Sequence, residues 1–329
     1  MNLPIIAIAI IGVALFFDFM NGFNDSSSIV ATMISSRAMS ARRALVMSAV
    51  AHFCAPFLFG VAVATTIGHD IVDPGSITIG VIFAALLAAI VWDLITWAFG
   101  IPSSSSHALV GGLIGAVSVN FGFAMIQMRG LLKVIMALFI SPILGLVAGY
   151  LLMRLVLFLA RGASPRINWF FKRAQILTSL ALALSHGTND AQKTMGIVTM
   201  SLVTLGYLSE FNVPWWVITL SAGAMSLGTA LGGWRIIRTL GAKFYKIRPV
   251  HGFAAQVTSA CVILGAALLG GPVSTTHVVS SAILGVGSAQ RVSRVRWNVA
   301  GNIAVAWLLT IPASGLLSAL FCLLARYLV

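Results

Sequence analysis

Long apolar stretches alternate with short polar or charged segments along the whole chain. Most stretches are close to the roughly 20 residues that a helix needs to cross the hydrocarbon core of a bilayer. Ten can be marked, at 3–36, 44–67, 76–98, 100–120, 131–160, 174–205, 213–232, 250–269, 272–288 and 298–328. Because a helix satisfies its own backbone hydrogen bonds in lipid, the pattern predicts an all-α integral membrane protein with about 10–12 membrane segments.

Two of these stretches, 3–36 and 174–205, are longer than one membrane crossing requires. As a continuous helix, 34 residues would reach about 51 Å, whereas the hydrocarbon core is about 30 Å thick. Each stretch carries a polar, glycine-containing segment near its middle. Irregular backbone at membrane depth is tolerated only where it lines a cavity or is buried in protein, so we expect broken helices or re-entrant hairpins.

Composition excludes a soluble protein. Hydrophobic residues make up 59% of the chain and charged residues only 8%, whereas a soluble domain carries about 25% charged residues. The net charge of +13 comes from Lys and Arg between the apolar runs, which is typical of membrane topology and argues against nucleic acid as a partner. We therefore expect a multi-pass protein of the cell (inner or plasma) membrane, with lipid as its surroundings.

Basic clusters indicate which loops face the cytoplasm, because short cytoplasmic loops are rich in Lys and Arg. The clusters lie at 37–43, 161–173, 235–248 and 291–296. Loops 68–75 and 206–213 have no Lys or Arg and hold the acidic residues Asp70, Asp73 and Glu210, so we expect them outside. This assignment sends 3–36 inward and 174–205 outward, and it leaves Arg129 and Lys133 on the outer side.

Two motifs occur twice in the chain. Gly22-Phe23-Asn24-Asp25 returns as Gly187-Thr188-Asn189-Asp190, and the segment from Gly100 to His107 returns as Gly270 to His277. The charge pattern gives the two copies opposite orientations, as in the inverted repeats of secondary transporters. We expect an N-terminal repeat at 1–160, a short basic cytoplasmic connection at 161–173 and a C-terminal repeat at 174–329.

Four carboxylates lie inside apolar segments: Asp18, Asp25, Asp93 and Asp190. A charge there costs roughly 2.5–3.5 kcal/mol on insertion scales, so it is normally functional or paired. Asp25 and Asp190 occupy matching repeat positions and are expected to bind cations or protons; the alternative is structural pairing with backbone or with Lys193. For Asp18 and Asp93, cation coupling and local hydrogen bonding stand as equal alternatives.

Uncharged polar groups accompany these carboxylates. Asn24 and Asn189 offer both a donor and an acceptor, or they cap helices at a break. Two hydroxyl clusters follow Pro102 and Pro272: Ser103, Ser104, Ser105 and Ser106 in the first, and Ser274, Thr275 and Thr276 in the second. If helices start there, two converging N-termini would form an anion site; capping alone is the alternative.

Four further residues are weaker candidates. His107 and His277 end the hydroxyl motifs at matched positions and would either bind substrate and protons or make structural hydrogen bonds. Lys193 would either offset substrate charge or neutralise Asp190. Gln192 is a candidate polar contact.

The motifs around these residues resemble the inorganic phosphate transporter (PiT) family over nearly the whole chain. The resemblance rests on 21–25, 102–107, 186–193 and 272–277. It implies two inverted repeats, a central phosphate site between hairpin-like broken helices, coupling to protons or sodium, and a homodimer. Ser28 departs from the Asn that is frequent in the family, and the long hydrophilic central loop of some relatives is absent.

The residues favour phosphate over sulfate if the aspartates touch the anion, because phosphate near neutral pH keeps a proton that it can donate to a carboxylate. A sulfate permease of the same fold is the alternative, followed by an anion channel. The coupling ion is H⁺ or Na⁺, with Asp25 and Asp190 as the Na⁺ ligands, and the cargo is free phosphate or a metal–phosphate complex. No cofactor, catalytic residue or ATPase loop is expected, so the protein is not expected to be an enzyme.

Overall fold

A computed structural model describes residues 3–69, 78–243 and 245–328. Asp70 and Asp73, which we expect in an outer loop, lie outside the described residues. Within the described part every regular element is a helix. The α-helices are α1 (Leu3–Ser35), α2 (Ala41–Phe59), α3 (Ala62–His69), α4 (Ile79–Phe99), α5 (Ser105–Phe121), α6 (Met128–Leu159), α7 (Ile167–Thr204), α8 (Trp215–Leu231), α9 (Trp234–Arg238), α10 (Pro249–Leu268), α11 (Thr275–Gln290) and α12 (Trp297–Leu328).

Short helical turns complete the described part: η2 (Phe123–Met125), η3 (Thr239–Lys243) and η4 (Val292–Arg294). Each of the ten apolar stretches coincides with one helix, except that 44–67 is divided into α2 and α3. Among the described residues, five helices are long and apolar enough to cross a membrane, or six if α8 and the segment after it, bent by 57°, form one span. The all-α membrane fold predicted from the sequence is confirmed.

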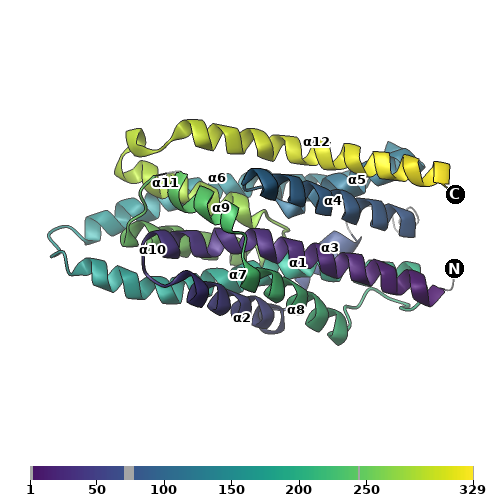
Figure 1. Ribbon diagram of the computed structural model, residues 1–329, viewed down its shortest axis with the longest axis horizontal. Helices are drawn as coiled ribbons and strands as arrows, with labels where there is room; N and C mark the ends of the chain where they lie inside the picture. The colour runs from purple at the N-terminus through teal and green to yellow at the C-terminus, as the bar shows by residue number, and fades with distance from the viewer. Residues whose placement is uncertain (1–2, 70–77, 244, 329) are drawn as a thin grey trace.

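The long helices run roughly along the longest axis of the molecule, and both termini lie at one end (Figure 1). The connection between α6 and α7 lies at the opposite end (Figure 1). Large hydrophobic side chains are exposed along α6 and α12. Such a surface suits lipid and not water, because the hydrocarbon tails are as apolar as the side chains.

The expected breaks inside 3–36 and 174–205 are wrong, because α1 and α7 are each continuous helices. Their glycines serve helix packing instead. A Cβ on Gly22 would lie 2.1 Å from the Met225 carbonyl oxygen of α8, and one on Gly187 would lie 2.9 Å from the His52 Cα of α2. The polar residues next to these glycines remain helical because groups on neighbouring segments form hydrogen bonds with their side chains.

The chain breaks instead at two hairpins, between α4 and α5 and between α10 and α11. Gly100 (φ 65°) is the C-cap of α4, and Gly270 (φ 69°) lies in the turn after α10. Both adopt the left-handed region that favours glycine. The α4–α5 hairpin lies toward the end of the molecule that holds the termini, and α10 and α11 lie toward the other end (Figure 1). The two hairpins therefore enter the helix bundle from opposite ends.

Candidate functional site

The tips of the two hairpins place two helix N-termini in the interior. Ser104 and Ser274 are the N-caps of α5 and α11, and their hydroxyls accept hydrogen bonds from the backbone N–H of His107 and His277 at 3.2 and 3.3 Å. Capping, the alternative reading, is therefore observed for these two serines. The hydroxyls that follow them, on Ser105, Ser106, Thr275 and Thr276, lie in the first helical turns and are buried.

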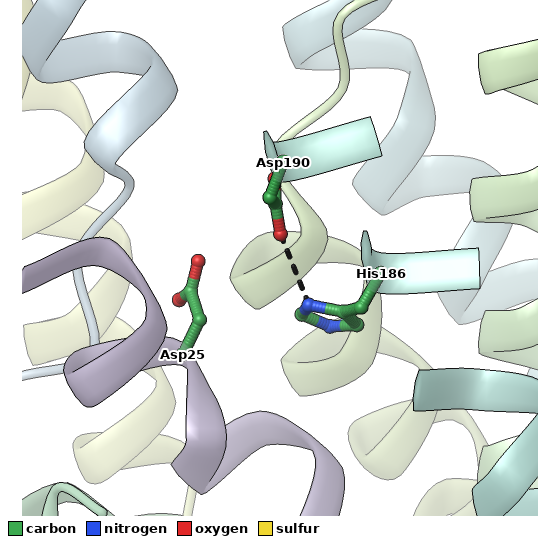
Figure 2. Close-up of side chains that lie close together, drawn as sticks. All are labelled: Asp25, His186 and Asp190. Atoms are coloured by element: carbon green, nitrogen blue, oxygen red, sulfur yellow. Dashed lines mark ion pairs between the residues drawn. The ribbon is translucent and has the colours of Figure 1, made fainter. Parts of the chain in front are cut away.

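Asp190 is the centre of a buried polar network. Its carboxylate pairs with the Lys193 ammonium on the same helix and accepts a 2.8 Å hydrogen bond from the Thr275 hydroxyl. The His186 Nδ1 lies 3.0 Å from Oδ2, the carboxylate oxygen that also accepts from Thr275 (Figure 2). All these side chains are fully or almost fully buried. A buried carboxylate is costly without partners, and here three surrounding groups stabilise it.

Lys193 extends this network from α7 to both hairpins. Its ammonium also donates to the Ser106 hydroxyl of α5 and to the Val273 carbonyl, the latter at 3.4 Å. The Ser106 hydroxyl donates in turn to the same carbonyl at 3.3 Å. One buried cation therefore links a carboxylate, a hydroxyl and a carbonyl from three segments.

Asp25 faces this network from α1. Its carboxylate accepts a hydrogen bond from the Thr276 hydroxyl. One turn earlier on α1, the Asn21 side-chain oxygen accepts from the Ser105 hydroxyl at 2.7 Å. Carboxylates from both halves thus accept from hydroxyls of the α10–α11 tip, and the hydroxyls of the α4–α5 tip join through Asn21 and Lys193. We call Asp25, Ser106, His186, Asp190, Lys193, Thr275 and Thr276 the central cluster.

A metal ion could fit among three of these residues. Ligand atoms of Asp25, His186 and Asp190 lie within 4.8 Å of one another, and Figure 2 shows the two carboxylates and the imidazole pointing toward one space. Carboxylate oxygens suit Na⁺ and divalent ions, whereas an imidazole ligand favours a transition metal. Na⁺ at Asp25 and Asp190 stays a prediction.

Asn24 and Asn189 bind backbone oxygens of the two hairpins, the first inside α4 and the second at the tip between α10 and α11. The Asn24 amide donates to the backbone oxygen of Asp93 at 3.4 Å, and the Asn189 amide donates to that of Gly271 at 3.1 Å. They do not cap helices, since both lie inside continuous helices. Their side-chain oxygens are buried without a hydrogen-bond partner among the described residues, so each keeps one acceptor for a ligand.

Several candidates lie outside the central cluster. The Ser103 hydroxyl is 2.7 Å from that of Thr96 on α4. Gln192 binds the break between α2 and α3, where its oxygen accepts from the backbone N–H of Val63 at 2.7 Å. These two side chains therefore stabilise turns of the chain.

The two histidines of the hydroxyl motifs contact each other, with ring centroids 4.5 Å apart. His277 also stacks on Trp307 of α12 at 3.9 Å. Asp18 and Asp93 are buried at 0% and 1% exposure. One oxygen of Asp93 lacks a hydrogen-bond partner among the described residues, whereas the Thr194 hydroxyl lies near Asp18. Cation coupling and local hydrogen bonding stay alternatives for both.

Sequence reasoning missed His186 and Asn21. Both lie four residues before the aspartate of their own half, which places them one turn away on the same helix face. They occupy matching repeat positions. The signal was present in this spacing, but the residue types differ between the halves.

A family model described as the phosphate transporter family matches residues 21–169 and 158–318. Probable low-affinity inorganic phosphate transporters are similar: the Rhizobium meliloti protein is 48% identical over 95% of this chain and 94% of its own length. The Bacillus subtilis protein is 47% identical over 97% and 96%. A solved structure described as the sodium-dependent phosphate transporter superposes with a TM-score of 0.88 at 25% identity, covering 100% of both chains.

The ion pair at Asp190 gives a stability prediction. Lys193→Met leaves the Asp190 carboxylate buried without its cation, and the free energy of unfolding should fall by about 3–5 kcal/mol. Asp190→Asn combined with Lys193→Met should recover most of the loss. Thermal unfolding of the purified protein measures both, with Lys172→Met, an exposed lysine on the same helix, as control. If Lys193→Met unfolds at the same temperature as the control, the pair does not stabilise the fold.

Proposed function

The chain belongs to the phosphate transporter family, and from this we propose that it imports inorganic phosphate by symport with H⁺ or Na⁺. The observation that carries the proposal is the central cluster, where two carboxylates and the hydroxyls of two hairpin tips meet inside the helix bundle. The relatives are named as transporters, which argues against an enzyme.

The charges of the central cluster support coupling to a cation. With Asp25 and Asp190 ionised and Lys193 protonated, the cluster carries one net negative charge. A phosphate anion entering this buried space would be repelled unless positive charge came with it. A proton on Asp25, or Na⁺ beside it, would each restore the balance. Charge balance therefore supports symport.

The same groups suit phosphate better than sulfate. Dihydrogen phosphate has hydroxyls that can donate to a carboxylate, and its oxygens can accept from Ser106, Thr275 and Thr276. The N-termini of α5 and α11 add positive dipole ends. Sulfate at neutral pH has no proton to donate to Asp25 or Asp190. A site built from both carboxylates thus discriminates between these oxyanions by protonation.

We also propose that the halves 1–160 and 174–329 form inverted repeats joined by 161–173. The packing pairs support this division: α5 packs with α12 as α11 packs with α6, and α1 packs with α8 as α7 packs with α2. The hairpins lie toward opposite ends of the molecule, as inverted repeats require (Figure 1).

A metal–phosphate complex is a second candidate cargo. The observation that favours it is His186, whose imidazole joins the two aspartates at ligand distance. If a divalent ion accompanies phosphate, uptake should require that ion, and His186→Ala should remove the requirement or the uptake.

Uptake into proteoliposomes tests the proposal. We expect an imposed Na⁺ or H⁺ gradient to drive accumulation of ³²P-phosphate, since only the coupling ion neutralises the cluster. Sulfate added in about tenfold excess should compete poorly, because it donates no hydrogen bond. We expect it to lower the phosphate uptake rate by about twofold or less. Sulfate accumulation without phosphate accumulation would keep the fold and overturn the substrate; accumulation of neither would overturn the function.

Charge removal at the two aspartates gives a second prediction. Asp25→Asn and Asp190→Asn should each reduce gradient-driven uptake by about a hundredfold or more, because the coupling ion loses its carboxylate. Glu210→Gln, in a loop and exposed, is the matched control and should transport normally. The assay is initial uptake rate per amount of folded protein, and normal rates in both aspartate variants would contradict the assignment.

A further inference from the structure

A basic pocket opens where α1 ends and α7 begins. Its volume is about 810 Å³, within the roughly 300–1,000 Å³ of small-molecule sites. The basic residues that line it are Arg37, Lys172, Lys246, Arg248 and Arg296. They come from segments far apart in the sequence, and no acidic residue is among the described residues of the lining. Convergent cations without a carboxylate suit an oxyanion.

Arg37 lines this pocket at the cost of backbone strain. Its φ is +56°, the one positive value of a non-glycine residue in the described part of the chain. The Ala38 N–H donates to the Met33 carbonyl at 3.0 Å, which makes Arg37 the left-handed residue of a helix C-cap where glycine is usual. Strained residues of this kind gather at functional sites. We therefore expect the Arg37 side chain to have a function besides setting the orientation of the chain in the membrane.

A polar helix face joins this pocket to the central cluster. Asp25, Ser28, Thr32 and Ser36 follow one another on α1 at steps of three and four residues, so they share one face. Asp25 belongs to the central cluster and Ser36 lines the pocket. The face spans about 16 Å at the helix rise per residue.

Buried hydroxyls without a hydrogen-bond partner among the described residues lie on α1 and on three helices that pack against it. Ser28, Ser179, Ser259 and Ser280 belong to α1, α7, α10 and α11, and each is 0% exposed. Their hydroxyls have no hydrogen-bond partner among the described residues. Helix α1 packs against the other three helices. Ser280 lies one helical turn after Thr276, whose hydroxyl contacts Asp25. Ser179 lies one helical turn after Gln175, in the direction of the central cluster along α7. Buried unsatisfied groups call for an explanation such as water or a passing polar solute.

Two glutamines close the interval between these serines and the pocket. Gln175 accepts from the Ser36 hydroxyl at 2.8 Å and donates to the Pro249 carbonyl at 2.9 Å. Gln256 donates to the Thr32 hydroxyl at 3.0 Å and accepts from that of Thr178 at 2.6 Å. These bridges tie α1, α7 and α10 together through neutral hydrogen bonds, which can break and re-form at modest cost.

We propose that the basic pocket binds orthophosphate at the cytoplasmic mouth of the transport route. The route follows the polar face of α1 past the four serines, and the bridges of Gln175 and Gln256 close it in this conformation. This inference rests on the proposed phosphate transport. It adds a second phosphate site, at which the anion is held by cations alone.

Cysteine labelling tests the route. Cys54, Cys261 and Cys322 are first replaced by Ala, and Ser179→Cys or Ser259→Cys is then introduced. Inside-out membrane vesicles expose the cytoplasmic face to a negatively charged, membrane-impermeant methanethiosulfonate. We expect both cysteines to react and phosphate to slow the reaction. Gln175→Ala removes two hydrogen bonds of the closure and should speed reaction at position 179 about fivefold.

Ser318→Cys is the matched control for labelling. Ser318 is equally buried and its hydroxyl is also unpartnered among the described residues, but it belongs to α12, away from the proposed route. It should not react. Reaction of neither route cysteine from the cytoplasmic face, or equal reaction at position 318, would overturn the route.

Charge removal tests the pocket. Arg37→Gly relieves the backbone strain while deleting a cation, so it should fold, and Lys246→Gln deletes a second cation. Together they should raise the KM for phosphate at the cytoplasmic face about five- to tenfold, and change the outer-face KM much less. Arg166→Gln, exposed and outside the pocket, is the control. Equal effects at both faces, or none, would overturn the pocket.

Two further arms identify the occupant. In vesicles of phosphatidylcholine alone the effect should persist; its loss there would assign the pocket to an anionic lipid headgroup and overturn the proposal. Tripolyphosphate at the cytoplasmic face should compete with phosphate at that face, whereas noncompetitive inhibition would indicate a separate regulatory site and also overturn it. If the wild-type protein transports no phosphate at either face, the proposed function itself has failed; if it does and only the pocket variants lack the effect, this inference alone has failed.

Discussion

The fold depends on the need to stabilise a buried carboxylate where no water can reach it. Asp190 is fully buried, and its charge is acceptable only because Lys193, His186 and Thr275 surround it. These partners come from α7 itself and from a hairpin tip, while Lys193 reaches the other tip through Ser106. The positions of both hairpins are therefore tied to one charge. An interior built in this way is sensitive to any ion that enters or leaves it.

The two halves differ at the position three residues after the aspartate. The second half has Lys193, which neutralises Asp190, and the first has Ser28, whose hydroxyl has no partner among the described residues. One carboxylate thus carries its own cation, whereas among the described residues Asp25 accepts its hydrogen bond from the neutral Thr276 hydroxyl. This asymmetry favours Asp25 as the place where the exchangeable cation acts. The same chain can then bind an anion beside fixed acidic groups without a permanent excess of negative charge.

The sequence predicted much of this arrangement. Apolar runs predicted the helices, and the paired motifs identified Asp25, Asp190 and the two hydroxyl clusters as candidates, parts of which the structure brings together in the central cluster. Glycine was misread as a helix breaker in α1 and α7, because its use in close helix packing depends on α2 and α8, which local sequence does not reveal. Tertiary contacts alone show that Gln192 stabilises a turn. The basic pocket could not be foreseen either, since its residues come from distant loops.

The central claim is that phosphate and its coupling cation bind together at the central cluster, each lowering the electrostatic cost of the other. Equilibrium binding of ³²P-phosphate to the purified protein, measured across Na⁺ concentration and pH, tests this directly. We expect the coupling ion to tighten phosphate binding and phosphate to tighten binding of that ion by the same factor, as linkage requires. Phosphate affinity that is the same at every Na⁺ concentration and pH would contradict it.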